Sequence, residues 1–161
     1  MAVTVPGAQE IATNGAGPGP SGLEQLLALQ ARGPSAVGVM TLLGARLESV
    51  DEGHVAFACE TRADFSNPMG MLHGGISATM LDSAMGCAVM SALPAGVGYI
   101  TVDLAVTYLR PVPLDGVTVR AEGRTIHVGN RIATASGTLS DPAGRVLATA
   151  TTTCLVLSGH R

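Results

Sequence analysis

The sequence predicts an α+β domain in which an antiparallel sheet of about six strands wraps around one long central helix, with a short N-terminal helix before it. The first observation is the segment from Ile76 to about Ala92, which is apolar or small almost all round and must therefore be enclosed. The second is a change to a period of two along the second half of the chain, which is typical of strands. The third is the length of 161 residues, which suits one domain with a substantial core.

The first expected element is a short surface helix over Leu23–Arg32, with Ser21 as its N-cap and a Gly-Pro pair as its stop. Residues 1–22 are rich in Gly, Pro, Ala and Thr and have no usable period, which predicts a disordered N-terminal arm. We therefore assign residues 23–158 to a single domain.

Two strands are expected before the central helix, because the segment Asp51-Glu52-Gly53 is a hairpin signal between two alternating runs. Four more alternating runs follow the helix, are separated by turn signals, and predict an antiparallel meander. The expected strands are Leu42–Val50, His54–Arg62, Ile100–Tyr108, Val117–Val128, Arg131–Ser140 and Val146–Leu157. In the last two expected strands, small residues occupy alternate positions and therefore share one face of the sheet, so a helix can lie close to that face. These residues are Ala133, Ala135, Gly137, Ala148 and Ala150.

Composition argues against several classes of partner. The net charge of −3 arises from 9 basic and 12 acidic residues, which leaves no basic field for nucleic acid. Asp82 divides the strongest apolar run, Ile76 to Leu93, so no membrane span is expected. The first residues lack a secretion signal, which favours a cytoplasmic location. A mean hydropathy of +0.38 is high for a soluble chain and favours association with further copies.

The three cysteines, Cys59, Cys87 and Cys154, are scattered in apolar segments. Their number and spacing predict buried thiols rather than a disulfide or a zinc site. The chain also lacks an H-E-x-x-H motif and a G-x-S-x-G elbow, so neither a zinc hydrolase nor a serine hydrolase is expected.

The densest cluster of unusual residues runs from Asn67 to Gly75 and leads directly into the central helix. Glycines at a helix start let a substrate approach the unpaired N–H groups, and the positive end of the dipole favours a developing oxyanion. The segment is therefore a candidate site for polarising a carbonyl group. A tight entry turn capped by His73 would explain the same glycines.

Asp82 lies in the middle of the helix among apolar neighbours, where an ionised carboxylate is costly unless it is paired or functional. Desolvation of a carboxyl group favours proton uptake, which suits a general base or a nucleophile. The alternative is a structural carboxylate that is hydrogen-bonded to Ser83 or to the backbone.

His73 and Asp82 are nine residues apart, which places them about 13 Å apart along one helix. That is too far for both to touch one carbonyl group, so if both act they act from different chains. A two-fold dimer with its helices side by side would bring Asn67, His73 and Gly74 of one subunit close to the partner's Asp82.

An amide residue six positions before His-Gly-Gly and a carboxylate nine positions after the His closely resemble hotdog-fold acyl-CoA thioesterases of the phenylacetate-degradation type. The resemblance extends through Thr101-Val102-Asp103 and the final strands, and it covers about Leu23 to Leu157. It implies a hotdog fold and hydrolysis of an acyl-CoA thioester to free acid and coenzyme A. It also implies a homodimer that assembles into a homotetramer.

By this resemblance, Asn67 and the backbone N–H of Gly74 polarise the thioester carbonyl, and His73 supports the turn or the departing sulfur. The partner's Asp82 activates water or attacks directly, and Thr101 orients that water. A thiolate leaves more easily than an alkoxide, so an activated water and an oxyanion site suffice without a metal. No cofactor is expected, because coenzyme A is part of the substrate.

The resemblance also indicates where coenzyme A binds. Gly75 belongs to the glycine turn against the substrate, and Gly129-Asn130-Arg131 at a hairpin tip resembles the family's segment near the coenzyme A phosphates. A solvated surface charge is the alternative interpretation of Arg131.

Two other functions remain open on the same fold. An acyl-CoA dehydratase is one, although no segment resembles the dehydratases' own His-containing motif. The other is a non-catalytic acyl-CoA-binding module that keeps the pocket without turnover. The presence of Asn67, His73, Gly74 and Asp82 together favours catalysis, because binding alone does not require a carboxylate in an apolar helix. Aromatic and medium-chain acyl groups both fit the sequence.

Overall fold

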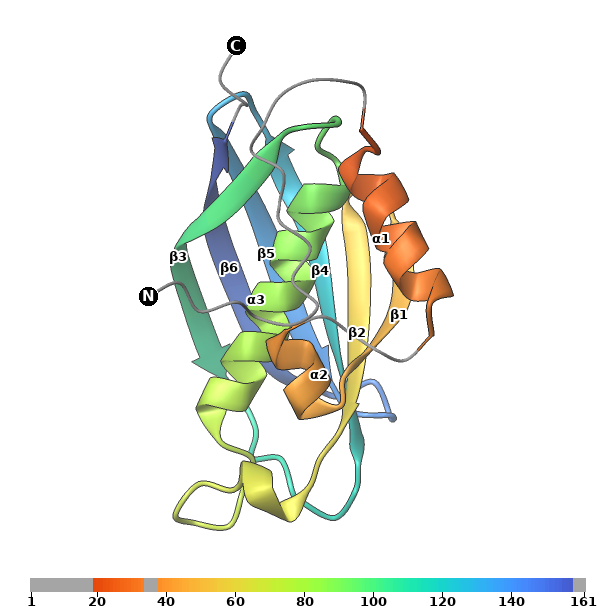
Figure 1. Ribbon diagram of the computed structural model, residues 1–161. Helices are drawn as coiled ribbons and strands as arrows, with labels where there is room; N and C mark the ends of the chain where they lie inside the picture. The colour runs from red at the N-terminus through yellow and green to blue at the C-terminus, as the bar shows by residue number, and fades with distance from the viewer. Residues whose placement is uncertain (1–18, 34–37, 158–161) are drawn as a thin grey trace, which may run out of the picture.

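The computed structural model describes residues 19–33 and 38–157. Within them, six antiparallel strands form one sheet in the order β1-β2-β4-β5-β6-β3, and the long helix α3 lies across one face of it (Figure 1). The predicted α+β architecture with six strands around one helix is confirmed. The elements are α1 Gly22–Ala31, α2 Val39–Leu43, α3 Gly74–Ser91, β1 Arg46–Asp51, β2 His54–Glu60, β3 Gly98–Tyr108, β4 Thr118–Val128, β5 Ile132–Ser140 and β6 Val146–Leu157.

The sheet meets α3 through its smallest residues. A Cβ atom added at Gly123 of β4 would lie 2.4 Å from the backbone carbon and oxygen of Ala84, so backbone touches backbone there. On β5, Gly137 faces the side chains of Leu81 and Met85, which are fully buried. The predicted small face on the last two strands is therefore confirmed, and it allows the helix to lie close to the sheet.

The short helix α1 is held to the end of α3. Ser21 caps it and forms a reciprocal capping box with Glu24, which confirms the predicted N-cap. The helix begins at Gly22, one residue earlier than predicted, and a Cβ atom there would overlap the backbone oxygen of Met90. Residues 1–18 of the predicted arm lie outside the described residues.

The start of the first predicted strand is wrong. The segment Val39–Leu43 forms α2, because Met40 and Leu43 sit three residues apart on one helical face and are both buried. Gly44 ends this helix in the left-handed conformation, with a φ of 67°, and β1 begins only at Arg46. The second strand likewise ends at Glu60, before a 3-10 turn over Ala63–Phe65.

The predicted meander is correct for β4, β5 and β6 and wrong for β3. Strand β3 pairs with β6 instead of β4, because the chain crosses the sheet with α3 and joins it at the far edge (Figure 1). This edge strand has no second strand partner among the described residues. Its Ile100, Val102 and Tyr108 are each about half exposed, at 48%, 55% and 52%.

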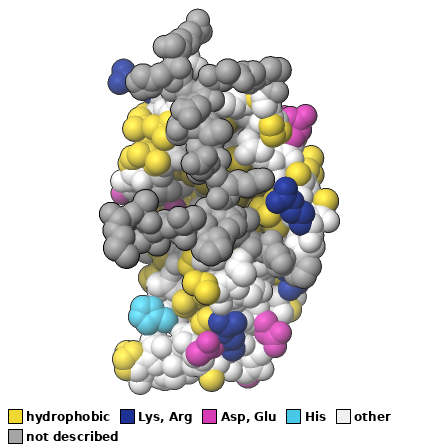
Figure 2. Space-filling view, in the orientation of Figure 1, with side chains coloured by type: hydrophobic (Ala, Val, Ile, Leu, Met, Phe, Trp, Pro, Cys, Tyr) yellow, Lys and Arg dark blue, Asp and Glu magenta, His cyan; other side chains and the backbone are white. Residues whose placement is uncertain are grey.

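Other apolar side chains are exposed elsewhere, and Figure 2 shows hydrophobic side chains at several places on one face of the molecule.

All three cysteines are free. Cys59 and Cys154 are buried and Cys87 is half-buried. Burial raises the pKa of each thiol, to about 12 for Cys87. Among residues 19–33 and 38–157, no helix is both long enough and apolar enough to cross a membrane.

Candidate active site

The loop before α3 is organised by Asn67. Its side-chain oxygen accepts the backbone N–H groups of Met69 at 2.9 Å and Met71 at 3.1 Å. The backbone N–H of Asn67 donates to the oxygen of Met71 at 2.8 Å, and Gly70 turns the chain with a φ of 75°. The amide nitrogen of the Asn67 side chain has no hydrogen-bond partner among the described residues, so both of its N–H groups are left for a ligand.

His73 caps the start of α3. Its Nδ1 atom accepts the backbone N–H of Gly75 at 2.9 Å, and its own backbone N–H donates to Phe65 at 2.8 Å. Because Nδ1 accepts, a neutral His73 ring carries its proton on Nε2. The N–H of Gly74 has no acceptor in the described part of the chain, and it therefore remains a free donor at the positive end of the helix.

Tyr108, at the end of β3, reaches the same turn. Its hydroxyl donates to the backbone oxygen of Gly74 at 2.8 Å, and its ring lies where a Cβ atom at Gly74 would be, 3.1 Å from Cζ and from the hydroxyl oxygen. A larger residue at position 74 would require the Tyr108 ring to shift by a few tenths of an ångström. The sequence pattern places Tyr108 on a strand face and indicates no function for it. The pairing of β3 with β6 brings it to the helix start.

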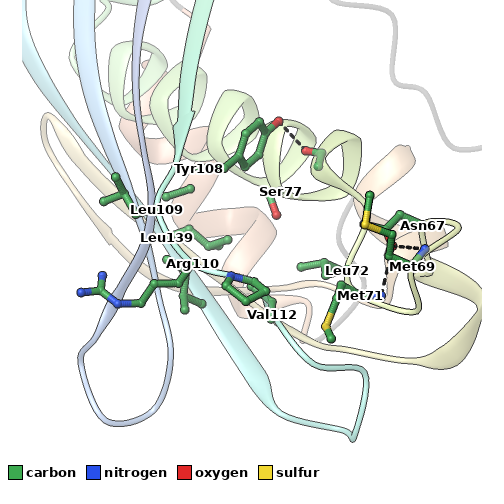
Figure 3. A pocket seen from close by; sticks show the side chains of 14 residues that line it. Asn67, Met69, Met71, Leu72, Ser77, Tyr108, Leu109, Arg110, Val112 and Leu139 are labelled. Atoms are coloured by element: carbon green, nitrogen blue, oxygen red, sulfur yellow. Dashed lines mark hydrogen bonds between the residues drawn. The ribbon is translucent and has the colours of Figure 1, made fainter.

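A pocket of about 440 Å³ opens beside this helix start (Figure 3). Asn67 and Gly74 line it together with Ser77, Tyr108 and Arg110, and the other lining side chains are apolar. The sequence gives no signal for Ser77 or Arg110, because nothing in their spacing separates them from ordinary helix and loop residues. The apolar part is formed by Met69, Met71, Leu72, Leu109, Pro111, Val112, Leu139, Leu147 and Ala148.

Asp82 lies on the flank of α3 that faces β3. The hydroxyl of Thr101 donates to its Oδ1 at 3.0 Å, so Thr101 replaces the predicted alternative partner Ser83. In one chain Asp82 is half-buried rather than enclosed, because β3 is an edge strand and leaves that flank of the helix open. After burial, the charge of Asp82 is the next cause that raises the pKa of the Cys87 thiol.

The predicted site residues fall into separate groups within one chain. Asn67, His73 and Gly74 come together at the start of α3, whereas Asp82 and Thr101 do not line the pocket. Gly74 and Asp82 are eight residues apart on one helix, so about 12 Å separates them along its axis. The structure places Gly74 and Asp82 on one continuous helix, as expected, and His73 caps its start.

The Gly129-Asn130-Arg131 segment lies at the tip between β4 and β5, at the opposite end of the sheet from Gly74 (Figure 1). The N–H of Gly129 donates to the oxygen of Ile132, and the oxygen of Arg131 accepts the N–H of Val156, both at 2.9 Å. The Asn130 and Arg131 residues are exposed. One chain alone does not bring this tip to the pocket.

Comparison with known proteins gives consistent matches. The family model of the thioesterase superfamily matches residues 69–148. A Halobacterium salinarum protein, provisionally named an esterase, is 34% identical over 111 residues, which is 66% of this chain and 72% of the relative.

Two solved structures extend the match. A phenylacetic acid degradation-related protein of Ralstonia eutropha, provisionally described as a thioesterase, is 30% identical with a TM-score of 0.71, over 81% of this chain and 98% of its own. A Streptococcus mutans protein bound to acetyl coenzyme A is 27% identical with a TM-score of 0.65, over 71% of this chain and 90% of its own.

A sheet wrapped around one helix, with free N–H donors beside a pocket at the helix start, defines a hotdog-fold domain with a site that can polarise a carbonyl group. The matches to the family model and to the Halobacterium relative show that this chain belongs to the thioesterase superfamily. It is a thioester hydrolase, and the resemblance seen in the sequence is confirmed.

Proposed function

We propose that the chain hydrolyses acyl-CoA thioesters to free acid and coenzyme A, at a site that two subunits share. The observation that carries this proposal is the helix start at Gly74, where a free backbone N–H borders a pocket of about 440 Å³. The acetyl coenzyme A bound by the Streptococcus mutans relative supports a coenzyme A thioester as the substrate.

Asn67 and Gly74 supply the donors that stabilise the oxyanion. The oxygen of the Asn67 amide is held by two loop N–H groups, which orients its NH₂ group toward a substrate rather than toward the loop. This amide and the Gly74 N–H together polarise the thioester carbonyl, and they act best on the negative oxygen of the tetrahedral intermediate. Because the loop and the helix cap fix both donors before binding, little reorganisation is needed.

The partner's Asp82 takes a proton from water as that water attacks the carbonyl carbon, or it attacks the carbon itself. Its hydrogen bond from Thr101 holds the carboxylate in place and leaves the second oxygen free to act. The carbon–sulfur bond then breaks and coenzyme A leaves as a thiolate. After direct attack, water hydrolyses the mixed anhydride that has formed on Asp82, which releases the acid and restores the carboxylate. The Nε2–H of His73 can donate to the departing sulfur, because Nδ1 of this ring is occupied by the N–H of Gly75. Because a thiolate leaves readily, we propose no metal and no cofactor.

Two chains associate through the free edge of β3 in this proposal. That edge carries unpaired backbone groups and the half-exposed Ile100 and Val102, and pairing it with a second β3 would cover both. A two-fold axis there brings the Asp82 flank of one α3 toward the Gly74 end of the other. It also moves the partner's Arg131 tip toward this pocket, where its charge meets the coenzyme A phosphates. Further association into a homotetramer would cover other apolar surface, such as Ile132.

The decisive experiment is thiol release from aromatic and aliphatic acyl-CoAs, comparing native protein with Asp82→Ala and Asp82→Asn. We expect kcat to fall by orders of magnitude in both variants, because each removes the carboxylate that is proposed to activate water or to attack. Asp115→Asn is the control, since Asp115 is an exposed carboxylate outside both the pocket lining and β3, and this variant should keep native activity. Binding of acyl-CoA without thiol release would replace hydrolysis with the binding-module alternative.

A further inference from the structure

Ser77 is a buried hydroxyl residue without a partner. It is 4% exposed, it lines the pocket one turn after Gly74, and its side chain points into that space (Figure 3). Its hydroxyl makes no hydrogen bond with any residue in 19–33 or 38–157, whereas Thr79 on the same helix donates to the oxygen of Gly75 at 2.9 Å. The Ser77 hydroxyl is not one of the buried oxygens that lack a partner in the described residues, which are those of Ser49 and Thr61. It opens onto the pocket, so it is available for a polar group that enters there.

The surroundings of Ser77 within the pocket are apolar. Leu72, Val112, Leu139 and Leu147 line the space beyond the helix, and all four are buried. An unsubstituted hydrocarbon chain would cover these side chains but leave the Ser77 hydroxyl without a hydrogen bond. A site with one such hydroxyl binds a ligand that can hydrogen-bond to it more tightly than an analogue without a hydrogen-bonding group at that position.

The position of Ser77 relative to Gly74 indicates which part of the ligand it meets. Three residues of helix rise by about 4.5 Å, and helical side chains lean back toward the N-terminus. If Gly74 holds the carbonyl oxygen, as in the proposed function on which this inference rests, then Ser77 faces the carbons that follow the carbonyl carbon. The substituent expected to meet this hydroxyl is therefore one close to the carbonyl group, such as an oxygen on the third acyl carbon.

We propose that Ser77 is a specificity-determining residue and that the preferred substrates are 3-hydroxyacyl-CoA thioesters. The substrate hydroxyl exchanges a hydrogen bond with Ser77, and the remainder of the acyl chain packs on the apolar wall of the pocket. Because a serine hydroxyl both donates and accepts, it accommodates either orientation of the substrate O–H group. A single hydroxyl fixed on a helix also distinguishes the two enantiomers at that carbon.

The test compares hydrolysis of (R)- and (S)-3-hydroxyhexanoyl-CoA with hydrolysis of hexanoyl-CoA by native protein, Ser77→Ala and Ser77→Thr. We expect native protein to prefer one hydroxylated enantiomer in kcat/KM by about tenfold, the value of one good hydrogen bond. Ser77→Ala should lose that preference while it retains hydrolysis of hexanoyl-CoA. Ser77→Thr keeps the hydroxyl and should restore the preference.

Ser91→Ala is the matched control, because Ser91 is a buried serine on the same helix with two partners, the N–H of Gly53 and the oxygen of Ala88, both at 2.8 Å. This variant should lower the thermal midpoint and leave the substrate preference unchanged. Equal kcat/KM for hydroxylated and plain substrates in native protein and in Ser77→Ala would overturn the assignment of Ser77 but leave thioester hydrolysis intact. Absence of thiol release from all three substrates, and from a wider acyl-CoA panel, would overturn the proposed function itself.

Discussion

At the scale of single residues, the two ends of the Asn67 amide have different tasks. The oxygen closes the loop through the N–H groups of Met69 and Met71, and the nitrogen is free to donate. Structure and chemistry therefore depend on different atoms of one side chain. Substitutions that remove one end or both ends can separate these contributions.

Asn67→Asp keeps an oxygen for the loop and replaces the donor with a second, negatively charged oxygen. We expect kcat to fall about 100- to 1000-fold, because an oxyanion donor is lost and a like charge is introduced. Thermal unfolding should stay close to native, since the loop hydrogen bonds persist. Asn67→Ala should lose both activity and stability. A fully active Asn67→Asp protein would contradict a donor function for this amide.

Residue identities at the helix start were predictable because their chemistry is unusual: glycines after a histidine, and a carboxylate in an apolar helix. Tyr108 and Ser77 were not, because a tyrosine at a strand end and a serine in a helix have ordinary explanations. Their importance arises from contacts across the fold. Tyr108 reaches Gly74 from 34 positions away, and Ser77 matters only because the pocket forms beside it.

At the scale of elements, the contact between α3 and the sheet sets the shape of the site. The alternation of small residues predicted this close contact, and Gly123 marks its tightest point. The short helix α2 was not predicted, because a segment of five residues is too short to distinguish a helical period from the alternation of a strand. The edge position of β3 was not predicted either, because the order of strands depends on where the chain crosses the sheet and not on the local sequence pattern.

Gly123→Ala should be severely destabilising. Its Cβ atom would lie 2.4 Å from the Ala84 carbonyl and 2.5 Å from the Met85 nitrogen, and backbone atoms of a packed helix cannot move aside cheaply. We expect a loss of at least about 3 kcal/mol in the free energy of unfolding, measured by urea titration. Gly137→Ala is the comparison, because its Cβ atom would meet flexible side-chain atoms of Met85 and Leu81 at 3.0 and 3.1 Å. Equal losses in the two variants would refute the backbone contact as the cause.

At the scale of the whole molecule, an ion-pair network crosses the outer face of β2 and β4. Glu122 accepts hydrogen bonds from Arg120, from Arg124 at 2.6 Å and from His54 at 2.6 Å. Burial alone would raise the pKa of Glu122, but these bonds outweigh it and lower the pKa from 4.5 to about 2. The folded state thus favours the ionised carboxylate.

The sign of the pH effect follows from that lowered pKa. The ionised Glu122 contributes to the free energy of unfolding. This contribution is fully present above its unfolded pKa of 4.5 and is lost as the pH falls toward about 2. Urea unfolding of native protein between pH 5 and pH 2 should show this loss, up to about 3 kcal/mol. Glu122→Gln should show a smaller decrease over the same range. A parallel decrease in both proteins would assign the acid sensitivity to other carboxylates.

The proposed active site requires two subunits, because within one chain Gly74 and Asp82 lie about 12 Å apart along the helix. Asn67→Ala and Asp82→Ala should each be nearly inactive as homodimers. If the variants are mixed and allowed to exchange subunits, half of the dimers become mixed, and each mixed dimer contains one intact and one doubly impaired site. Thiol release should then recover to about a quarter of the native rate. Mixing that exchanges subunits, as shown by differently tagged chains, yet restores no activity would place Asn67 and Asp82 in the same subunit's site and refute the shared arrangement.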